Sequence, residues 1–384
     1  METLVVAALA SALIFLASLV AVEAALSVAI IEIIAGVAAG NIFGIHGAPW
    51  LDFLALFGGV LLTFLAGAEV DPGLLRSNLR ASVGLGTASF LSPFLFAGAF
   101  AFFIAHWTLK ASLIAGVALS TTSLAVVYAV LIETKLNVTR LGKLLMAATF
   151  VTDIGVALAL SLLFIEPNLS TAVFFLVSAV VIVLAPRMIP PIFERYGERV
   201  IEPEIKLLFA ILLGLMLLAK MGKSHAVLPV FVLGLVLAPM FHRNRGLRRK
   251  LRVVAFGAIT PMFFLKGGMN VSLALIWPQI GLVLAFFLVK LVSKSVAVYP
   301  LARQHLPGAP IYATLLMSTG LTFGTISSLY GLNAGFIDRA QFSVLLFVVI
   351  ASAVVPTLVA QRWFTPRLTP EEQEEVLARE EESM

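Results

Sequence analysis

The chain has 384 residues, of which 60% are apolar and 12% are charged, with a formal net charge of +5, and its mean hydropathy is +1.05. A soluble protein contains about 25% charged residues, so this chain lacks the charge that an aqueous surface requires, and a water-soluble globular fold is excluded. It contains no cysteine, which excludes a disulfide scaffold, thiolate metal sites and cysteine nucleophiles.

Apolar stretches follow one another almost from end to end of the chain. A membrane helix needs roughly 17–25 apolar residues, whereas the strands of a membrane barrel alternate polar and apolar residues, and these stretches are apolar on all sides. The sequence therefore predicts an all-α polytopic membrane protein with about 13 transmembrane helices. In chain order the stretches are 4–22, 25–43, 51–67, 81–104, 111–131, 144–165, 171–189, 205–219, 226–240, 253–267, 280–299, 311–330 and 342–360.

The two ends of the chain are interpreted separately from these stretches. Glu2 stands where a signal peptide would carry basic residues, so the first stretch is predicted to be a membrane helix and not a removable leader. Residues 1–366 are predicted to form the transmembrane domain, and residues 367–384, which are rich in glutamate, a short acidic cytoplasmic tail.

Lys and Arg are distributed unevenly among the loops. Most of them follow the third, fifth, seventh, ninth, eleventh and last stretches, and the opposite side holds only Lys110, Lys220, Lys223, Lys266 and Arg339. Because loops rich in Lys and Arg stay in the cytoplasm, we expect the N-terminus outside the cell and the C-terminus in the cytoplasm. The basic run 243–252 is interpreted as an anchor near anionic lipid of the bilayer, and no nucleic-acid partner is expected.

Asp153 is an acidic residue deep inside a predicted membrane helix. It has about eight apolar or small residues on each side, and an ionisable group at that depth is costly unless it is paired or faces a cavity. A carboxyl group that holds either a proton or a metal ion is suited to ion exchange, although a structural contact between helices is the alternative. We predict that Asp153 binds the transported ion, with the hydroxyl groups of Thr152 beside it and Thr149 one turn earlier as further ligands.

Clusters of hydroxyl residues interrupt the fifth and twelfth stretches. Such side chains compete with the backbone for hydrogen bonds, so each cluster predicts a break whose freed carbonyl groups face a cavity. The stretches are seven apart, an odd number, so the two copies run in opposite directions, as in inverted-repeat transporters whose broken helices meet near the midplane. The clusters are Ser120, Thr121, Thr122 and Ser123 in the fifth stretch, and Ser318, Thr319, Gly320, Thr322, Gly324 and Thr325 in the twelfth.

Two lysines lie in the eleventh stretch. Lys290 falls in the middle of the span, and we predict that it is a counter-ion for Asp153 or a titrating group. Lys294 lies one turn nearer the helix end, where a long side chain can snorkel to the membrane surface, so we expect it at the interface.

Five segments together resemble the monovalent cation:proton antiporter superfamily in their order and spacing. The similarity is to its second branch, that of bacterial and archaeal sodium or potassium/proton exchangers, over roughly residues 25–360. The resemblance implies a 13-helix inverted repeat and a homodimer, with a panel of dimerising helices and a six-helix core, including residues 81–165 and 280–360, that moves like an elevator. The segments are GGVLLTFLAGAEVD, LIAGVALSTTSLAVV, TRLGKLLMAATFVTDIG, TPMFFLKGGMNVSL and MSTGLTFGTISSLYG.

The same resemblance implies roles for individual residues. Asp153 is similar to the essential ion-binding aspartate, Thr122 to the ligand in the unwound helix, and Lys290 to a membrane-embedded lysine of some members. Thr152 stands where electrogenic members have a second aspartate, so we expect one proton per cation instead of a two-proton cycle. Regulation of the kind found in glutathione-gated potassium-efflux relatives is expected to need a separate subunit.

The sequence thus predicts a secondary transporter that exchanges sodium for protons across the cytoplasmic membrane. The sodium ion is expected at Asp153, with Thr122 and Ser123 among its ligands, and no cofactor besides the transported ions is expected. HExxH, Walker and GxSxG patterns do not occur, so an enzyme is disfavoured. A potassium/proton antiporter or potassium-efflux subunit of the same fold remains an alternative. A sodium-coupled symporter of an organic anion, which would favour cationic or aromatic groups at the crossing, and a passive channel are less favoured.

Overall fold

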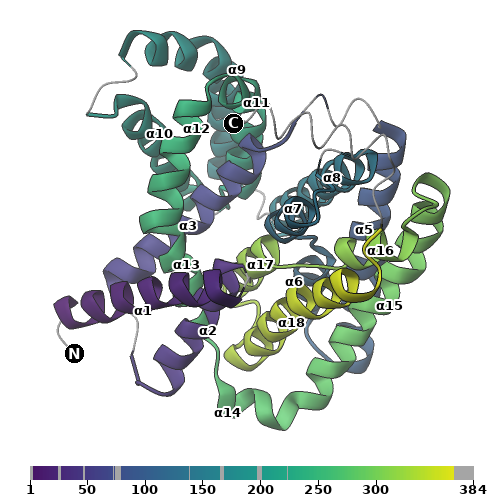
Figure 1. The fold of residues 1–384 in the computed structure, drawn as a ribbon. Coiled ribbons are helices and arrows are strands. Elements are labelled where there is room, and N and C mark those ends of the chain that lie inside the picture. The colour runs from purple at the N-terminus through teal and green to yellow at the C-terminus, as the bar shows by residue number, and fades with distance from the viewer. Residues whose placement is uncertain are drawn as a thin grey trace. The chain divides into compact units, whose positions relative to one another are not determined.

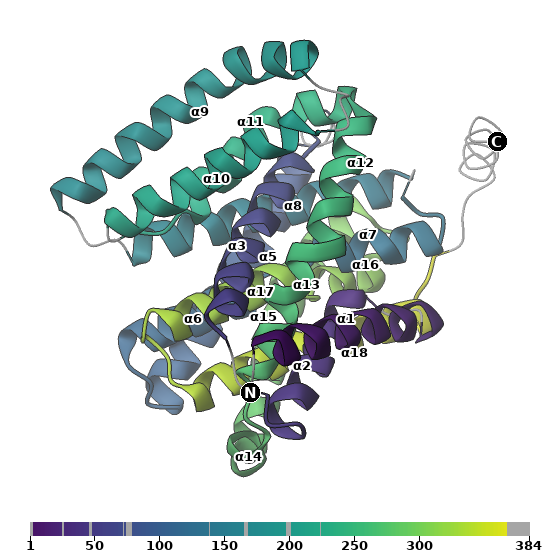
Figure 2. The same cartoon turned by 90° about the vertical axis from the view of Figure 1, so that its left-hand side faces the viewer.

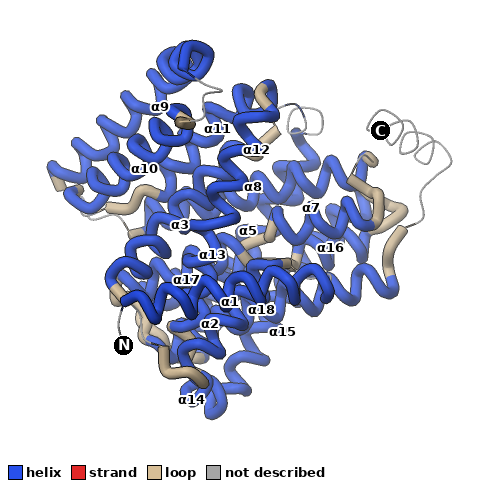
Figure 3. Tube along the Cα trace, turned by 60° about the vertical axis from the view of Figure 1, so that its left-hand side comes forward, coloured by secondary structure: helices blue, strands red, loops and turns tan. Residues whose placement is uncertain are grey.

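A computed structural model describes residues 3–24, 27–45, 48–71, 73, 79–137, 139–164, 168–196, 201–222 and 224–366. In these ranges every regular element is a helix, as Figure 3 shows. The predicted acidic tail, residues 367–384, lies outside the described residues.

The chain divides into two units, and each is built from two separate parts of the sequence (Figure 1). Unit 1 comprises Met1–Asp71 and Ala157–Val271, and unit 2 comprises Pro72–Val156 and Ser272–Met384. The helix α8 (Arg140–Leu163) begins in unit 2 and ends in unit 1. The other helices of unit 1 are α1 (Thr3–Ala24), α2 (Val28–Asn41), α3 (Pro49–Ala68), α9 (Leu169–Tyr196), α10 (Pro203–Met221), α11 (Val227–Arg243), α12 (Arg245–Val254), η2 (Ala255–Ile259) and α13 (Thr260–Met269). Those of unit 2 are α5 (Leu79–Ala99), η1 (Phe100–Ile104), α6 (Leu109–Ser120), α7 (Leu124–Glu133), α14 (Leu273–Ile276), η3 (Trp277–Gln279), α15 (Ile280–His305), α16 (Pro310–Met317), α17 (Thr322–Asn333) and α18 (Arg339–Trp363).

The lengths of these helices fit a membrane protein. Among the described residues, nine helical segments are long and apolar enough to cross a bilayer, and α2 and α11 are shorter apolar helices. Each predicted stretch corresponds to one helix or to a run of consecutive helices, which is compatible with the predicted count. The predicted fold class, an all-α polytopic membrane protein with two interrupted helices, is confirmed.

The outer surface of unit 1 is apolar along α9. This helix packs against α10 and α11 (Figure 2), yet its other side exposes large apolar side chains, among them Leu176, Val183 and Met188. Contiguous exposed apolar surface marks a face that meets a membrane or another apolar partner. The face is therefore the kind of surface that a membrane-embedded chain presents to lipid.

Two closely packed helix pairs form the interior of unit 1. Gly67 of α3 faces the carbonyl oxygen of Phe231 in α11, and Gly36 of α2 faces that of Leu265 in α13, and a methyl group at either glycine would collide with that backbone. Small residues allow membrane helices to approach this closely, and the association is then driven by van der Waals packing. The contact between α2 and α13 thus depends on the missing side chain of Gly36.

Replacing Gly36 by Ala is expected to destabilise the protein by about 1–3 kcal/mol, because the added methyl group must push α2 and α13 apart. The matched control is Gly214→Ala on α10, where the added methyl group meets no neighbouring atom within 4 Å. That variant should be neutral or gain up to about 1 kcal/mol through helix propensity. Unfolding of both purified variants in detergent measures the difference, and equal stabilities would contradict the close approach.

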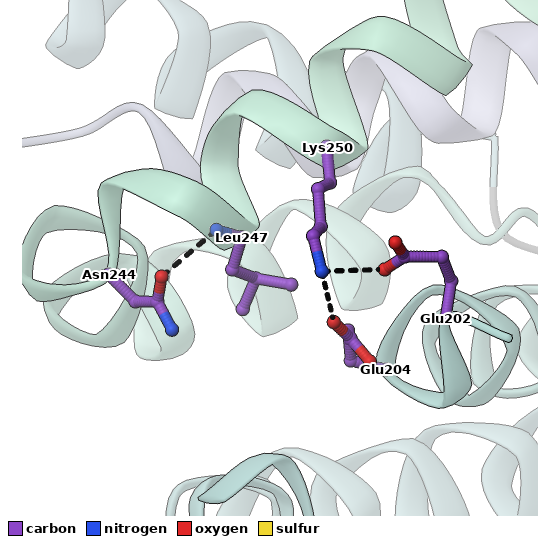
Figure 4. Close-up of polar contacts among 5 residues, drawn as sticks. All are labelled: Glu202, Glu204, Asn244, Leu247 and Lys250. Carbon is purple, nitrogen blue, oxygen red and sulfur yellow. Dashed lines mark hydrogen bonds and ion pairs between the residues drawn. The ribbon is translucent and has the colours of Figure 1, made fainter. Parts of the chain in front are cut away.

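Two ion pairs connect the basic helix α12 to the start of α10. Lys250 Nζ lies 2.9 Å from Glu202 Oε2 and 3.3 Å from Glu204 Oε1, and Figure 4 shows the ammonium group between the two carboxylates. Asn244 caps α12 by accepting a hydrogen bond of 2.9 Å from the backbone N–H of Leu247. Part of the positive charge of the run 243–252 is therefore balanced within the protein.

Candidate functional site

The first interruption, residues 121–123, separates α6 from α7 in unit 2. The Thr121 hydroxyl donates to the carbonyl oxygen of Ala118 over 3.1 Å, and the Ser123 hydroxyl accepts from the backbone N–H of Val126 over 3.4 Å. The first contact is the local bonding by which hydroxyl residues compete with a helix, and the second is an N-cap. The hydroxyl cluster therefore ends one helix and begins the next.

The second interruption, residues 318–321, separates α16 from α17. The Thr319 hydroxyl donates to the carbonyl oxygen of Leu316 over 2.7 Å, and the Ser318 hydroxyl donates to that of Thr314 over 2.8 Å. The contact of Thr319 with the carbonyl group three residues earlier repeats that of Thr121 in the first interruption. Thr322 is the first residue of α17 and so lies just beyond the break.

The two interruptions are in direct contact. The Thr122 hydroxyl donates to the carbonyl oxygen of Met317 over 2.9 Å, and the backbone N–H of Ser123 donates to the Thr319 hydroxyl over 3.4 Å. All four residues are at most 2% exposed. Segments almost 200 residues apart in sequence thus meet inside unit 2, and we call this contact the crossing.

Lys294 of α15 lies at the crossing and bonds to both interruptions. Its ammonium group donates to the carbonyl oxygens of Thr121 (2.8 Å) and Met317 (2.7 Å) and to the hydroxyl groups of Thr122 (2.9 Å) and Ser89 (3.1 Å). The two carbonyl groups end α6 and α16, and the C-terminal end of a helix carries partial negative charge that favours a cation. The ammonium group is therefore surrounded by four oxygen acceptors and faces two negative helix ends.

This position corrects the expectation that Lys294 snorkels to the membrane interface. Its side chain is fully buried, with 0% exposure, because four acceptors inside the protein replace the water that a surface position would supply. A sequence signal for it did exist. Lys294 follows Lys290 by four residues and so lies on the same helical face, which places both lysines on one side of α15.

Asp153, in α8, is 2% exposed. Thr149, one turn earlier on the same face of α8, contacts Met317 at the end of α16, with 3.9 Å between Oγ1 and Sδ. The face of α8 that carries the predicted aspartate therefore adjoins the crossing.

Thr152, the neighbour of Asp153, faces a different helix. Its hydroxyl donates to the carbonyl oxygen of Ala148 over 3.1 Å and approaches that of Gly86 in α5 at 3.4 Å. Gly86 leaves the space for this contact, since a methyl group there would lie 2.5 Å from the Ala148 carbonyl oxygen. The structure places Thr152 on the packing surface between α8 and α5.

Of the remaining predicted residues, Lys290 and Ser120 lie near the crossing. The Lys290 ammonium group donates to the Ser352 hydroxyl of α18 over 2.8 Å. The Ser120 hydroxyl donates to the carbonyl oxygen of Val117 over 2.8 Å and closes the last turn of α6. The lysine at the crossing itself is Lys294, and sequence reasoning missed it together with Ser89 and Ser352, which bind the two ammonium groups.

Comparisons with known proteins all point to cation/proton antiporters. The profile of the family described as sodium/hydrogen exchanger, transmembrane, matches residues 7–365. The chain is 25% identical over 358 residues to the probable Na⁺/H⁺ antiporter 3 of Methanocaldococcus jannaschii. The aligned region covers 86% of this chain and 89% of that protein. It is 28% identical over 244 residues to the cation/H⁺ antiporter 18 of Arabidopsis thaliana, but spans only 30% of that protein's length and 59% of its own. The solved structure of the sodium proton antiporter MjNhaP1 from Methanocaldococcus jannaschii matches with a TM-score of 0.63 over 94% of this chain and 97% of that chain, and at 14% identity this likeness concerns the fold.

Proposed function

The chain belongs to the family of transmembrane sodium/hydrogen exchangers, and on that premise we propose that it is a secondary antiporter that exchanges sodium ions for protons across the cytoplasmic membrane. One observation carries the proposal. A buried acid, Asp153, lies on the face of α8 that contacts the crossing, where the carbonyl groups of two interrupted helices accept hydrogen bonds from the Lys294 side chain.

The proposed binding step is a competition at Asp153. The carboxylate takes either a proton or a sodium ion, and neutral oxygen atoms complete the coordination of the metal ion. Unwound backbone carbonyl groups and the C-terminal ends of half-helices coordinate such ions in transporters built this way. The hydroxyl groups of Thr149, Thr122 and Ser123 are the side-chain ligands that we propose.

We propose one proton per cation. The proton-loaded and the sodium-loaded site carry the same net charge, because one monovalent ion replaces another on a single carboxylate. The neighbouring position holds Thr152, which cannot ionise and which bonds toward α5. Exchange is therefore expected to be electroneutral, so that dissipating the membrane potential with an ionophore leaves its rate unchanged.

The transport movement and the assembly are also proposals. All the residues of the crossing, with Asp153 and both lysines, belong to unit 2, which includes most of the predicted core segments 81–165 and 280–360. We propose that this core carries the ion past a dimer-forming panel in an elevator movement within a homodimer, with the N-terminus outside the cell. A charge that entered hydrocarbon without compensation would cost at least about 2.5–3.5 kcal/mol, which favours movement of the loaded site.

The test is proton movement in proteoliposomes that contain a pH-sensitive dye. We expect sodium chloride to cause rapid proton movement, whereas choline chloride at equal ionic strength causes none. Parallel additions of lithium and potassium separate the sodium exchanger from the potassium/proton antiporter of the same fold. Conductance without proton coupling, or no response to any alkali cation, would contradict the proposal.

A further inference from the structure

The chain passes from unit 1 to unit 2 between α13 and α14, at the peptide bond that joins Val271 to Ser272. Because α13 ends at Met269 and α14 begins at Leu273, this peptide group lies between two helices. The backbone N–H of Val271 donates to the carbonyl oxygen of Gly268 over 3.0 Å. Val271 is thus attached to the end of α13, and the next residue already belongs to the other unit.

One side chain from each unit binds this linking peptide. Asn41, the last residue of α2 in unit 1, donates through its Nδ2 to the carbonyl oxygen of Val271 over 2.9 Å. Ser343 of α18 in unit 2 accepts a hydrogen bond of 3.0 Å from the backbone N–H of Ser272. The carbonyl group of the linking peptide is therefore held by unit 1, and its N–H is held by unit 2.

Both side chains are also fixed to their own helices. The Asn41 Nδ2 donates to the carbonyl oxygen of Val37, one turn earlier in α2, over 2.8 Å. The Ser343 hydroxyl donates to the carbonyl oxygen of Arg339, in the first turn of α18, over 2.6 Å, and its side chain is fully buried. Each side chain therefore moves with its helix, so the two hydrogen bonds connect the linking peptide to α2 and to α18.

The linking peptide is a planar group of fixed dimensions, so it bridges one separation between the two side chains that bind it. Asn41 and Ser343 belong to different units, and a movement of one unit past the other changes that separation. Both hydrogen bonds form only where the separation matches the peptide group. After a larger movement the peptide group can retain either bond but not both.

We infer that Asn41, Ser343 and the peptide between Val271 and Ser272 form a clamp that stabilises one end state of the transport movement by one hydrogen bond. The inference rests on the proposed function, because it needs units that move relative to each other. Asn41 and Ser343 are positioning residues, and they lie on helices other than α8 and the interrupted helices. They set the population ratio of the two end states, whereas the ion binds at Asp153.

The clamp predicts a non-additive effect of two substitutions. Asn41→Ala or Ser343→Ala leaves one hydrogen bond on the linking peptide both before and after the movement, so either change alone removes the whole advantage of the clamped state. The double variant has neither bond in either state, so it should behave like the single variants. Since a neutral hydrogen bond favours its state by about two- to tenfold, each of the three proteins should raise the ratio of the unclamped to the clamped state by that factor.

Two matched substitutions control for effects on single helices. Ser327→Ala also removes a buried hydroxyl group, whose hydrogen bond of 2.7 Å goes to the carbonyl oxygen of Phe323 in its own helix, α17. Asn333→Ala makes the same change as Asn41→Ala at another helix end, that of α17. Both controls should keep the ratio of the wild type. Asn41→Asp keeps the shape of the side chain, but an ionised carboxylate only accepts hydrogen bonds, so this variant should act like Asn41→Ala.

The ratio of the end states is measured as a distance between the units. The chain contains no cysteine, so Leu176→Cys on α9 of unit 1 and Leu95→Cys on α5 of unit 2, both at exposed positions, take spin labels without background. Pulsed electron paramagnetic resonance of labelled protein, diluted with unlabelled protein in lipid nanodiscs, gives the distances and their populations. The same ratio in the Asn41, Ser343 and control variants, or a double variant whose effect is the product of the single effects, would overturn the inference.

Exchange by the unlabelled wild type separates this inference from the proposed function. If the wild type exchanges sodium for protons in proteoliposomes while the Asn41 and Ser343 variants leave the distances unchanged, the clamp is wrong and the exchange stands. If the distances shift as expected but no alkali cation causes proton movement, the clamp stands and the proposed function is wrong.

Discussion

Replacing Asp153 by Asn is expected to reduce sodium-dependent proton movement in proteoliposomes to the level of empty vesicles. The amide has nearly the shape of the carboxyl group, so the fold should survive, but it neither takes up a proton nor carries the charge that a sodium ion requires. Dye-reported proton movement at saturating sodium measures the loss, and gel filtration with thermal unfolding shows that the variant is folded.

The matched control for this variant is Asp338→Asn, which makes the same chemical change at an exposed position. Asp338 caps α18 by accepting a hydrogen bond of 2.8 Å from the backbone N–H of Gln341, and Asn serves as an N-cap about as well as Asp. We expect this variant to exchange at the wild-type rate. Exchange by Asp153→Asn at the rate of Asp338→Asn would refute the assignment of Asp153 as the ion-binding residue.

Replacing Lys294 by Met is expected to lower the free energy of unfolding by about 3–5 kcal/mol, which is typical when one partner of a buried charged network is removed. The substitution leaves the carbonyl groups of Thr121 and Met317 without the donor that they share. Exchange should fall to background as well, because the interrupted helices lose the group that binds them both. Unfolding of the purified protein and dye-reported exchange measure the two effects.

Lys110→Met is the matched control for this second variant. Lys110 is exposed, and its ammonium group lies 4.7 Å from the centre of the Phe336 ring, a contact worth about 0.5–1 kcal/mol at an exposed site. We expect Lys110→Met to lose no more than that and to exchange normally. If Lys294→Met proves as stable as Lys110→Met, the four hydrogen bonds of Lys294 do not hold the crossing together.

Much of the candidate site could be predicted from the sequence because the membrane makes polar residues conspicuous. A hydroxyl cluster or an aspartate inside an apolar helix is costly in hydrocarbon, so its presence alone indicated the two interruptions and Asp153. The sequence does not show, however, which neighbouring helix a polar side chain faces. Thr152 and Thr149 lie on the same helix with similar polarity, yet one bonds toward Gly86 and the other contacts Met317.

Hydropathy and hydroxyl clusters in the sequence by themselves determined the helical membrane fold, the positions of the two breaks and the place of the buried acid. Only the tertiary structure decided which lysine lies at the crossing. The acceptors of Lys294 stand 205, 173, 172 and 23 residues from it in sequence, so no local pattern could show that four oxygen atoms converge on its ammonium group. The position of a residue within an apolar helix can be determined from its neighbours in the sequence. The acceptors that stabilise a buried lysine lie on other helices, so they depend on how the chain folds.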